Sequence, residues 1–126
     1  IGHLGVLPQS AKSFKFKGKK LIERNKILKE AKLLEGAGVF SMVLECVESS
    51  LAKLITKEIR IPTIGIGASS NCDGQVLVTD DLTGLNSINV RFVKRYSNLR
   101  KIIERAVIDY KKEVKNLEFP KKKHSF

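Results

Sequence analysis

The chain has 126 residues, of which 42% are hydrophobic and 29% charged, and these values predict one globular domain rather than a disordered chain. No apolar run approaches the roughly 20 residues of a membrane-spanning helix, and the chain shows no signal-peptide pattern, so we expect a soluble, cytoplasmic protein without a membrane partner. Cys46 and Cys72 have no His or Cys at metal-ligand spacing, which predicts reduced thiols and no zinc site.

A formal net charge of +11 raises the question of a nucleic-acid partner. The basic residues are spread over the faces of expected helices, and the few aromatic residues are not interleaved with them. This placement favours a solvated surface and no nucleic acid. The clusters Lys15–Lys20 and Lys121–Lys123 leave a basic nucleic-acid-binding module open as an alternative.

The chain begins with a segment, residues 1–4, that is typical of the end of a strand. A long loop is expected over residues 5–20, and loops of that length often act as lids or binding loops. Apolar residues at helical spacing then predict a helix over residues 20–35. Its end is expected at Gly36-Ala37-Gly38, because glycine adopts the left-handed conformation that closes helices.

An apolar run over residues 39–45 ends in the carboxylate of Glu45. Such a run predicts a strand that is buried on both faces, as in a parallel sheet covered by helices. Glu45 would then lie at the C-terminal edge of the sheet, where catalytic groups gather in α/β folds. Burial disfavours the charged form of a carboxyl group, which suits a base that takes a proton near neutral pH. The alternative is that Glu45 only pairs with a nearby lysine.

The rest of the chain continues the alternation of strand and helix. Glu48-Ser49-Ser50 provides an N-cap for a helix that ends near Glu58, and residues 61–67 predict a second apolar strand. A third strand is expected at 75–78, followed by a loop over 79–90. Apolar residues at helical spacing predict a final helix over 99–114.

These elements make four strand units, with helices after at least the first, second and fourth. This order predicts an α/β fold with a parallel sheet. The sheet could stand alone as a small open domain, or it could be half of an eight-stranded (β/α) barrel, which needs about 250 residues to close. The start within a strand favours the half barrel.

Seven sets of residues, in order from end to end of the chain, carry a resemblance to a known family. They are Gly2–Gly5, Pro8–Ser10, Leu44–Val47, Ile61–Ala68, Cys72–Val78, Phe92–Tyr96, and Phe119-Pro120 with His124–Phe126. Together they resemble the ketopantoate hydroxymethyltransferases, also called 3-methyl-2-oxobutanoate hydroxymethyltransferases. The resemblance implies that residues 1–126 form the C-terminal half, about four β/α units, of a single (β/α)8 TIM barrel domain.

The resemblance also implies a reaction. The family transfers a hydroxymethyl group from 5,10-methylenetetrahydrofolate to 2-oxoisovalerate, giving ketopantoate for pantothenate biosynthesis, with Mg2+ stabilising the enolate. Glu45 matches the base of the family. His3 matches a histidine that would orient the substrate or the base by a hydrogen bond, the alternative being a structural histidine.

Other positions receive structural roles or none. Asp73 is expected to hold a turn, and Gly65 and Gly67 to leave room at the barrel mouth, while His124 is assigned no role. Glu48 stands where the family usually has a proline.

The metal ligands of the family lie in the N-terminal half of the barrel, which has no counterpart in these residues. We therefore expect the isolated chain to be inactive and to need that half as its partner, within a homo-oligomer that is a decamer in the family. The alternative function is a catalytically inactive barrel fragment with a scaffold or assembly role.

Overall fold

A computed structural model describes residues 1–7 and 15–126 of the chain. Residues 8–14 of the expected loop, including the Pro8–Ser10 segment, lie outside the described residues. The chain divides into two compact units, one formed by Ile1–Leu77 with Val90–Val93 and the other by Val78–Asn89 with Lys94–Phe126.

The first unit is built on a four-stranded parallel sheet with the order β1-β2-β3-β4. The strands are β1 (Gly2–Gly5), β2 (Met42–Glu45), β3 (Thr63–Ile66) and β4 (Gly74–Gln75). The expected α/β class and parallel sheet are thus confirmed. Because all the strands run in one direction, their C-terminal ends share one edge of the sheet.

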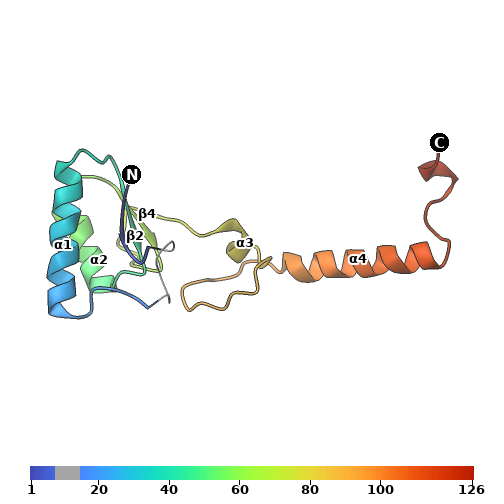
Figure 1. The fold of residues 1–126 in the computed structure, drawn as a ribbon, viewed down its shortest axis with the longest axis horizontal. Coiled ribbons are helices and arrows are strands. Elements are labelled where there is room, and N and C mark those ends of the chain that lie inside the picture. Colours follow the sequence, from blue (N-terminus) through green and yellow to red (C-terminus); the bar gives the residue numbers. More distant parts are fainter. Residues whose placement is uncertain (8–14) are drawn as a thin grey trace. The chain divides into compact units, whose positions relative to one another are not determined.

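Two helices cover one side of this sheet (Figure 1): α1 (Leu21–Gly36) and α2 (Ser49–Glu58). Both helices lie where the sequence predicts them, and their apolar faces pack on the strands in one core. The centre of this core is formed by Ile27, Ala31, Met42, Leu44, Leu51 and Ile55. Leu21, in the first turn of α1, is exposed and lies outside this core.

Strand β2 is shorter than expected and begins at Met42 rather than at residue 39. The N–H groups of Gly38 and Val39 still bond to carbonyls of α1, so the chain enters the sheet only after Phe40, which is exposed. Within β2 itself Met42 and Leu44 are fully buried and Val43 is half-buried.

The third expected strand is also shorter, since β4 ends at Gln75 instead of residue 78. The N–H of Val76 still bonds to the carbonyl of Gly65. The carbonyl of Val78 then accepts the N–H groups of Asp81 and Leu82, which starts α3 (Thr79–Leu82) inside the expected loop. Acidic residues in this first turn suit the positive end of a helix.

The second unit contains α3, α4 (Leu99–Lys115) and the 3-10 turn η1 (Lys122–His124). Asn98 caps α4 by accepting the N–H of Lys101. The last expected helix is therefore confirmed, but no residue of α4 is buried. The expectation that residues 1–126 belong to a single barrel domain stays a prediction. No helix of the described residues is long and apolar enough to cross a membrane.

Candidate active site at the C-terminal edge of the sheet

The register of the first two strands brings His3 close to Glu45. His3 lies opposite Val43, and Gly5 lies opposite Glu45. Side chains at alternate positions of a strand point to the same face, so Val43 and Glu45 share the face on which His3 is a diagonal neighbour. A histidine and a glutamate are long enough to meet across that diagonal.

The Nε2 atom of His3 lies 3.0 Å from Oε2 of Glu45. The Glu45 side chain is 9% exposed and the His3 side chain 34%, so the carboxylate is buried while the imidazole reaches the surface. Within the described residues, His3 is the hydrogen-bond partner of this carboxylate. Among the described residues Glu45 therefore pairs with His3 and not with a lysine, which was the alternative. A buried carboxylate held by one directional hydrogen bond is suited to proton transfer.

Gly5 allows β1 to run close to the end of β2. Its φ of 102° lies in the left-handed region, and the next N–H, that of Val6, donates to the carbonyl of Glu45 at 2.9 Å. A Cβ at this position would strike the carbonyl oxygen of Glu45 and approach Val47 Cγ2 to 2.8 Å. A glycine is thus required beside the carboxylate.

Cys46 follows Glu45 in a strained backbone conformation, with a φ of 50°. Its N–H donates to the carbonyl of Ile66 and its carbonyl accepts the N–H of Lys17, so both backbone groups remain bonded at this bend. Burial, and next the negative charge of Glu45, raises the pKa of the Cys46 thiol above its usual value. A protonated, buried thiol is a poor nucleophile, and both cysteines are free as predicted.

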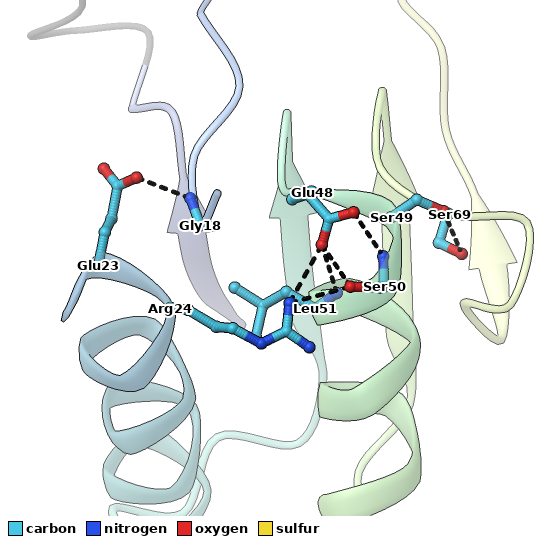
Figure 2. A network of polar contacts seen from close by, with 8 residues as sticks. All are labelled: Gly18, Glu23, Arg24, Glu48, Ser49, Ser50, Leu51 and Ser69. Carbon is cyan, nitrogen blue, oxygen red and sulfur yellow. Dashed lines mark hydrogen bonds and ion pairs between the residues drawn. The ribbon is translucent and has the colours of Figure 1, made fainter. Parts of the chain in front are cut away.

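Glu48 anchors the first turn of α2 (Figure 2). Its carboxylate accepts the hydroxyl and the N–H of Ser50, the N–H of Leu51 at 3.0 Å, and Nη1 of Arg24 at 3.1 Å. The hydrogen bonds from Ser50 come first among the causes that lower the pKa of Glu48 to about 2. The N-cap predicted at this position is therefore confirmed. Its pairing with Arg24 on α1 was not predicted, since no local pattern links positions so far apart.

The segment before α1 is tied to the same edge. The N–H of Lys17 donates to the carbonyl of Cys46, and the N–H of Glu48 donates to the carbonyl of Lys17. Figure 2 also shows Gly18 donating its N–H to Glu23 in the first turn of α1. Within the lysine-rich cluster, Lys17 thus forms a strand-like bridge with Val47, just after the end of β2.

Asp73 lies at the opposite end of the sheet from Glu45. Its Oδ2 accepts the N–H of Thr63 at 2.8 Å and the Thr63 hydroxyl at 2.9 Å, and that hydroxyl also contacts Thr56 at 2.8 Å. The hydrogen bonds from the Thr63 backbone and then from its hydroxyl lower the pKa of Asp73. This carboxylate therefore joins the turn before β4 to the start of β3, as the structural role predicted for it requires.

The remaining candidates lie elsewhere. Gly67 faces the ring of Phe92, and Gly65 faces the side chains of Gln75 and Cys72, so protein side chains occupy the room that both glycines leave. In the second unit, His124 packs its ring 5.1 Å from that of Phe119. The described residues contain no group of three or more His, Cys, Asp or Glu side chains that could hold a metal ion.

Comparison with known proteins links this geometry to a family. The family model described as ketopantoate hydroxymethyltransferase matches residues 1–122. The chain is 68% identical over 126 residues to the 3-methyl-2-oxobutanoate hydroxymethyltransferase of Pelagibacter ubique (strain HTCC1062), covering 100% of this chain and 49% of that protein.

Proteins of the same name give similar matches in other bacteria. The protein of Leptospira interrogans (strain Fiocruz L1-130) is 50% identical over 130 residues, with 49% of it covered, and that of Syntrophus aciditrophicus (strain SB) is 49% identical, with 48% covered. The matches span this whole chain, so the chain corresponds to about half the length of these curated relatives. The chain belongs to the ketopantoate hydroxymethyltransferase family.

Proposed function

We propose that this chain supplies Glu45 as the general base of a hydroxymethyl transfer from 5,10-methylenetetrahydrofolate to 2-oxoisovalerate, with ketopantoate as the product. The observation that carries the proposal is the buried Glu45 carboxylate held by His3 at the C-terminal edge of a parallel sheet. Family membership supplies the reaction class, and this edge is where α/β enzymes place their reacting groups.

In the proposed reaction Glu45 takes the proton from C3 of 2-oxoisovalerate. The C3 carbon forms a new bond to the methylene carbon of the donor, and both bonds from that carbon to folate nitrogens break. Water supplies the oxygen of the new hydroxyl group. The proton from C3 and one proton from water end on the two nitrogens, and tetrahydrofolate leaves.

His3 acts in this proposal as a positioning residue. An imidazole that donates its Nε2–H to Oε2 of Glu45 would hold the carboxylate in one rotamer, at the observed 3.0 Å. The other oxygen, Oε1, is then left to accept the substrate proton. Because the two residues come from neighbouring strands, the register of the sheet sets this geometry.

The proposal includes a partner, because the chain spans about half the length of its relatives. We propose that residues 1–126 form the C-terminal half of a (β/α)8 barrel and act with the N-terminal half, in a cytoplasmic homo-oligomer. Bound Mg2+ would polarise the oxo acid and acidify C3. We assign its ligands to the N-terminal half of the barrel, as the resemblance to the family implies.

The test uses the full-length protein and its Glu45→Gln variant, which keeps the side-chain shape but cannot accept the proton. Ketopantoate formation and exchange of the C3 proton of 2-oxoisovalerate with D2O are measured in the presence of Mg2+. Glu45→Gln is expected to lower both rates by a factor on the order of 10²–10⁴, the usual contribution of a general base. Glu58→Gln, a change at an exposed ion pair with Lys32, is the matched control and is expected to keep both rates.

Two outcomes would contradict the proposal. A Glu45→Gln variant that retains the exchange rate shows that another group is the base. A parent protein that neither forms ketopantoate nor exchanges the proton favours the alternative of an inactive barrel with an assembly role.

A further inference from the structure

A cavity of about 780 Å³ opens beside the C-terminal ends of β2 and β3, in the first unit. Its walls come from the segments that follow these strands, together with residues before α1 and residues 90–93. The lining includes Phe16, Cys46, Glu48, Ser69, Arg91 and Phe92. Because Cys46 directly follows Glu45 in the chain, the cavity lies next to the proposed base.

Several polar groups that line this cavity are already bonded within the protein. Glu48 is engaged by Arg24 and by the first turn of α2. The hydroxyl of Ser69 accepts the Ser49 hydroxyl and the Asn71 N–H, and its carbonyl accepts Nε2 of Gln75. A ligand here therefore gains little from these groups and would bind through the apolar and cationic parts of the wall.

Arg91 provides the cationic part. Its side chain is exposed and has no hydrogen bond or ion pair within residues 1–7 and 15–126. Arg24, in contrast, is bonded to Glu48 and Ser50. A planar guanidinium at the wall of a cavity that no described residue binds is a suitable site for a carboxylate, which it can bind through two parallel hydrogen bonds.

Two aromatic rings provide the apolar part. Phe92 packs against Gly67, whose φ is 61° and where a Cβ would approach the ring to 2.7 Å, so a glycine is what allows the ring to lie there. Phe16 lies on the cavity wall with half of its surface exposed. Aromatic faces of this kind stack on flat ring systems.

The volume of the cavity suits the larger of the two substrates of the proposed reaction. Cavities of roughly 300–1,000 Å³ hold ligands of drug size, and a small branched oxo acid would fill only a minor part of about 780 Å³. A reduced folate carries a pterin with a planar pyrimidine ring, an aromatic linker and a glutamate tail with carboxylates. Its rings match the aromatic walls formed by Phe16 and Phe92, and its anionic tail matches the guanidinium of Arg91.

We propose that this cavity binds the folate donor, with Arg91 holding a carboxylate of the glutamate tail and with Phe16 and Phe92 contacting its rings. The inference rests on the proposed function, because it takes the identity of the donor from it. It adds a donor site one residue from Glu45, so that the methylene carbon and the deprotonated substrate meet at one edge of the sheet.

The test titrates tetrahydrofolate into the full-length protein by calorimetry, and into its Arg91→Gln, Arg91→Lys and Arg60→Gln variants. Arg60 is the matched control because its side chain is exposed and lies outside the cavity lining. Arg91→Gln is expected to weaken tetrahydrofolate binding about tenfold or more, the effect of losing one charge-assisted contact. Arg91→Lys is expected to weaken binding less, since the positive charge remains while the paired N–H donors of the guanidinium are lost. Arg60→Gln is expected to leave tetrahydrofolate binding unchanged.

Steady-state kinetics provide the second readout. The KM for the donor is expected to rise about tenfold in Arg91→Gln, while the KM for 2-oxoisovalerate changes less than about twofold. Equal tetrahydrofolate binding by the parent and Arg91→Gln, or a rise confined to the KM for the oxo acid, overturns the inference while the base assignment stands. If the parent shows no proton exchange and no product, the proposed function fails, and the calorimetric comparison alone still decides whether Arg91 binds a folate.

Discussion

His3 and Glu45 are 42 positions apart in the chain, and their side chains meet at 3.0 Å between Nε2 and Oε2. The contact exists because β1 and β2 pair in a register that sets Gly5 beside Glu45. A shift of that register by one residue would move His3 to the other face of the sheet. The pairing of the two strands therefore determines the proposed catalytic geometry.

We predict that His3→Ala lowers kcat about 10²-fold, because a base displaced by about 1 Å loses activity on that scale. His3→Gln retains a donor and is expected to recover part of the rate. Ketopantoate formation and the C3 proton exchange measure the effect, with circular dichroism as the check on folding. A purely structural histidine would instead lower the melting temperature and leave the rate per folded molecule unchanged.

The second prediction concerns Gly5. Gly5→Ala places a Cβ on a left-handed backbone and against the carbonyl oxygen of Glu45. We expect the free energy of unfolding to fall by about 1–3 kcal/mol, together with a loss of turnover, since the strain acts at the end of β2. Gly36→Ala is the control, because a Cβ there meets no atom within 4 Å and alanine favours helices. Equal stability of both variants in urea denaturation would contradict the prediction.

The third prediction concerns the pH dependence of stability through Glu48. The pKa of Glu48 in the folded protein is about 2, below the ordinary value of 4.5, so this carboxylate stabilises the fold fully above pH 4.5. That contribution is lost as the pH falls from 4.5 toward 2. Glu48→Gln is expected to lower stability by about 1 kcal/mol at neutral pH, as the loss of an N-cap does, and to flatten the slope in this window.

Urea unfolding at several pH values measures this effect. Glu113→Gln, at an exposed position of α4, is the control and is expected to keep the slope of the parent. Parallel slopes for the parent and Glu48→Gln would show that the hydrogen bonds of Glu48 drawn in Figure 2 add no pH-dependent stability.

The fourth prediction separates Asp73 and Thr63 from catalysis. Thr63→Val keeps the shape of a fully buried side chain but removes the hydroxyl that joins Thr56 and Asp73. We expect a loss of about 1–3 kcal/mol of stability, because buried polar partners lose their hydrogen bonds. The rate per folded molecule is expected to persist, since these groups lie at the start of β3 and Glu45 lies at the end of β2. A specific loss of kcat without destabilisation would refute this assignment.

A final prediction concerns the chain alone. A separate protein of residues 1–126 is expected to be inactive and to aggregate, because in the proposed half barrel the outer strands lack neighbours. Turnover and gel filtration measure activity and aggregation. Coexpression with the N-terminal half of the full-length protein is expected to restore turnover and to prevent aggregation. An active, monomeric chain of 126 residues would show that no further half is needed.

Local patterns in the sequence were sufficient for the three long helices and for the four strands of the sheet. Helical spacing identified α1, α2 and α4, and the apolar run identified β2 with Glu45 at its end. The short segments shared with a family were sufficient to indicate that family. These signals are local, because each depends on residues within a few turns of helix or within one strand.

Contacts between distant residues were decided only by the tertiary structure. The pairs Arg24 with Glu48, Thr63 with Asp73, and Phe92 with Gly67 depend on how strands register and how helices cross the sheet. The early end of β4 and the short helix α3 also depend on the tertiary structure, because they are set by the point at which the chain stops pairing with β3. The sequence alone thus singled out Glu45 as the proposed base, and the parallel pairing of β1 with β2 decided that His3 lies against it, because only register places residues of different strands within hydrogen-bonding distance.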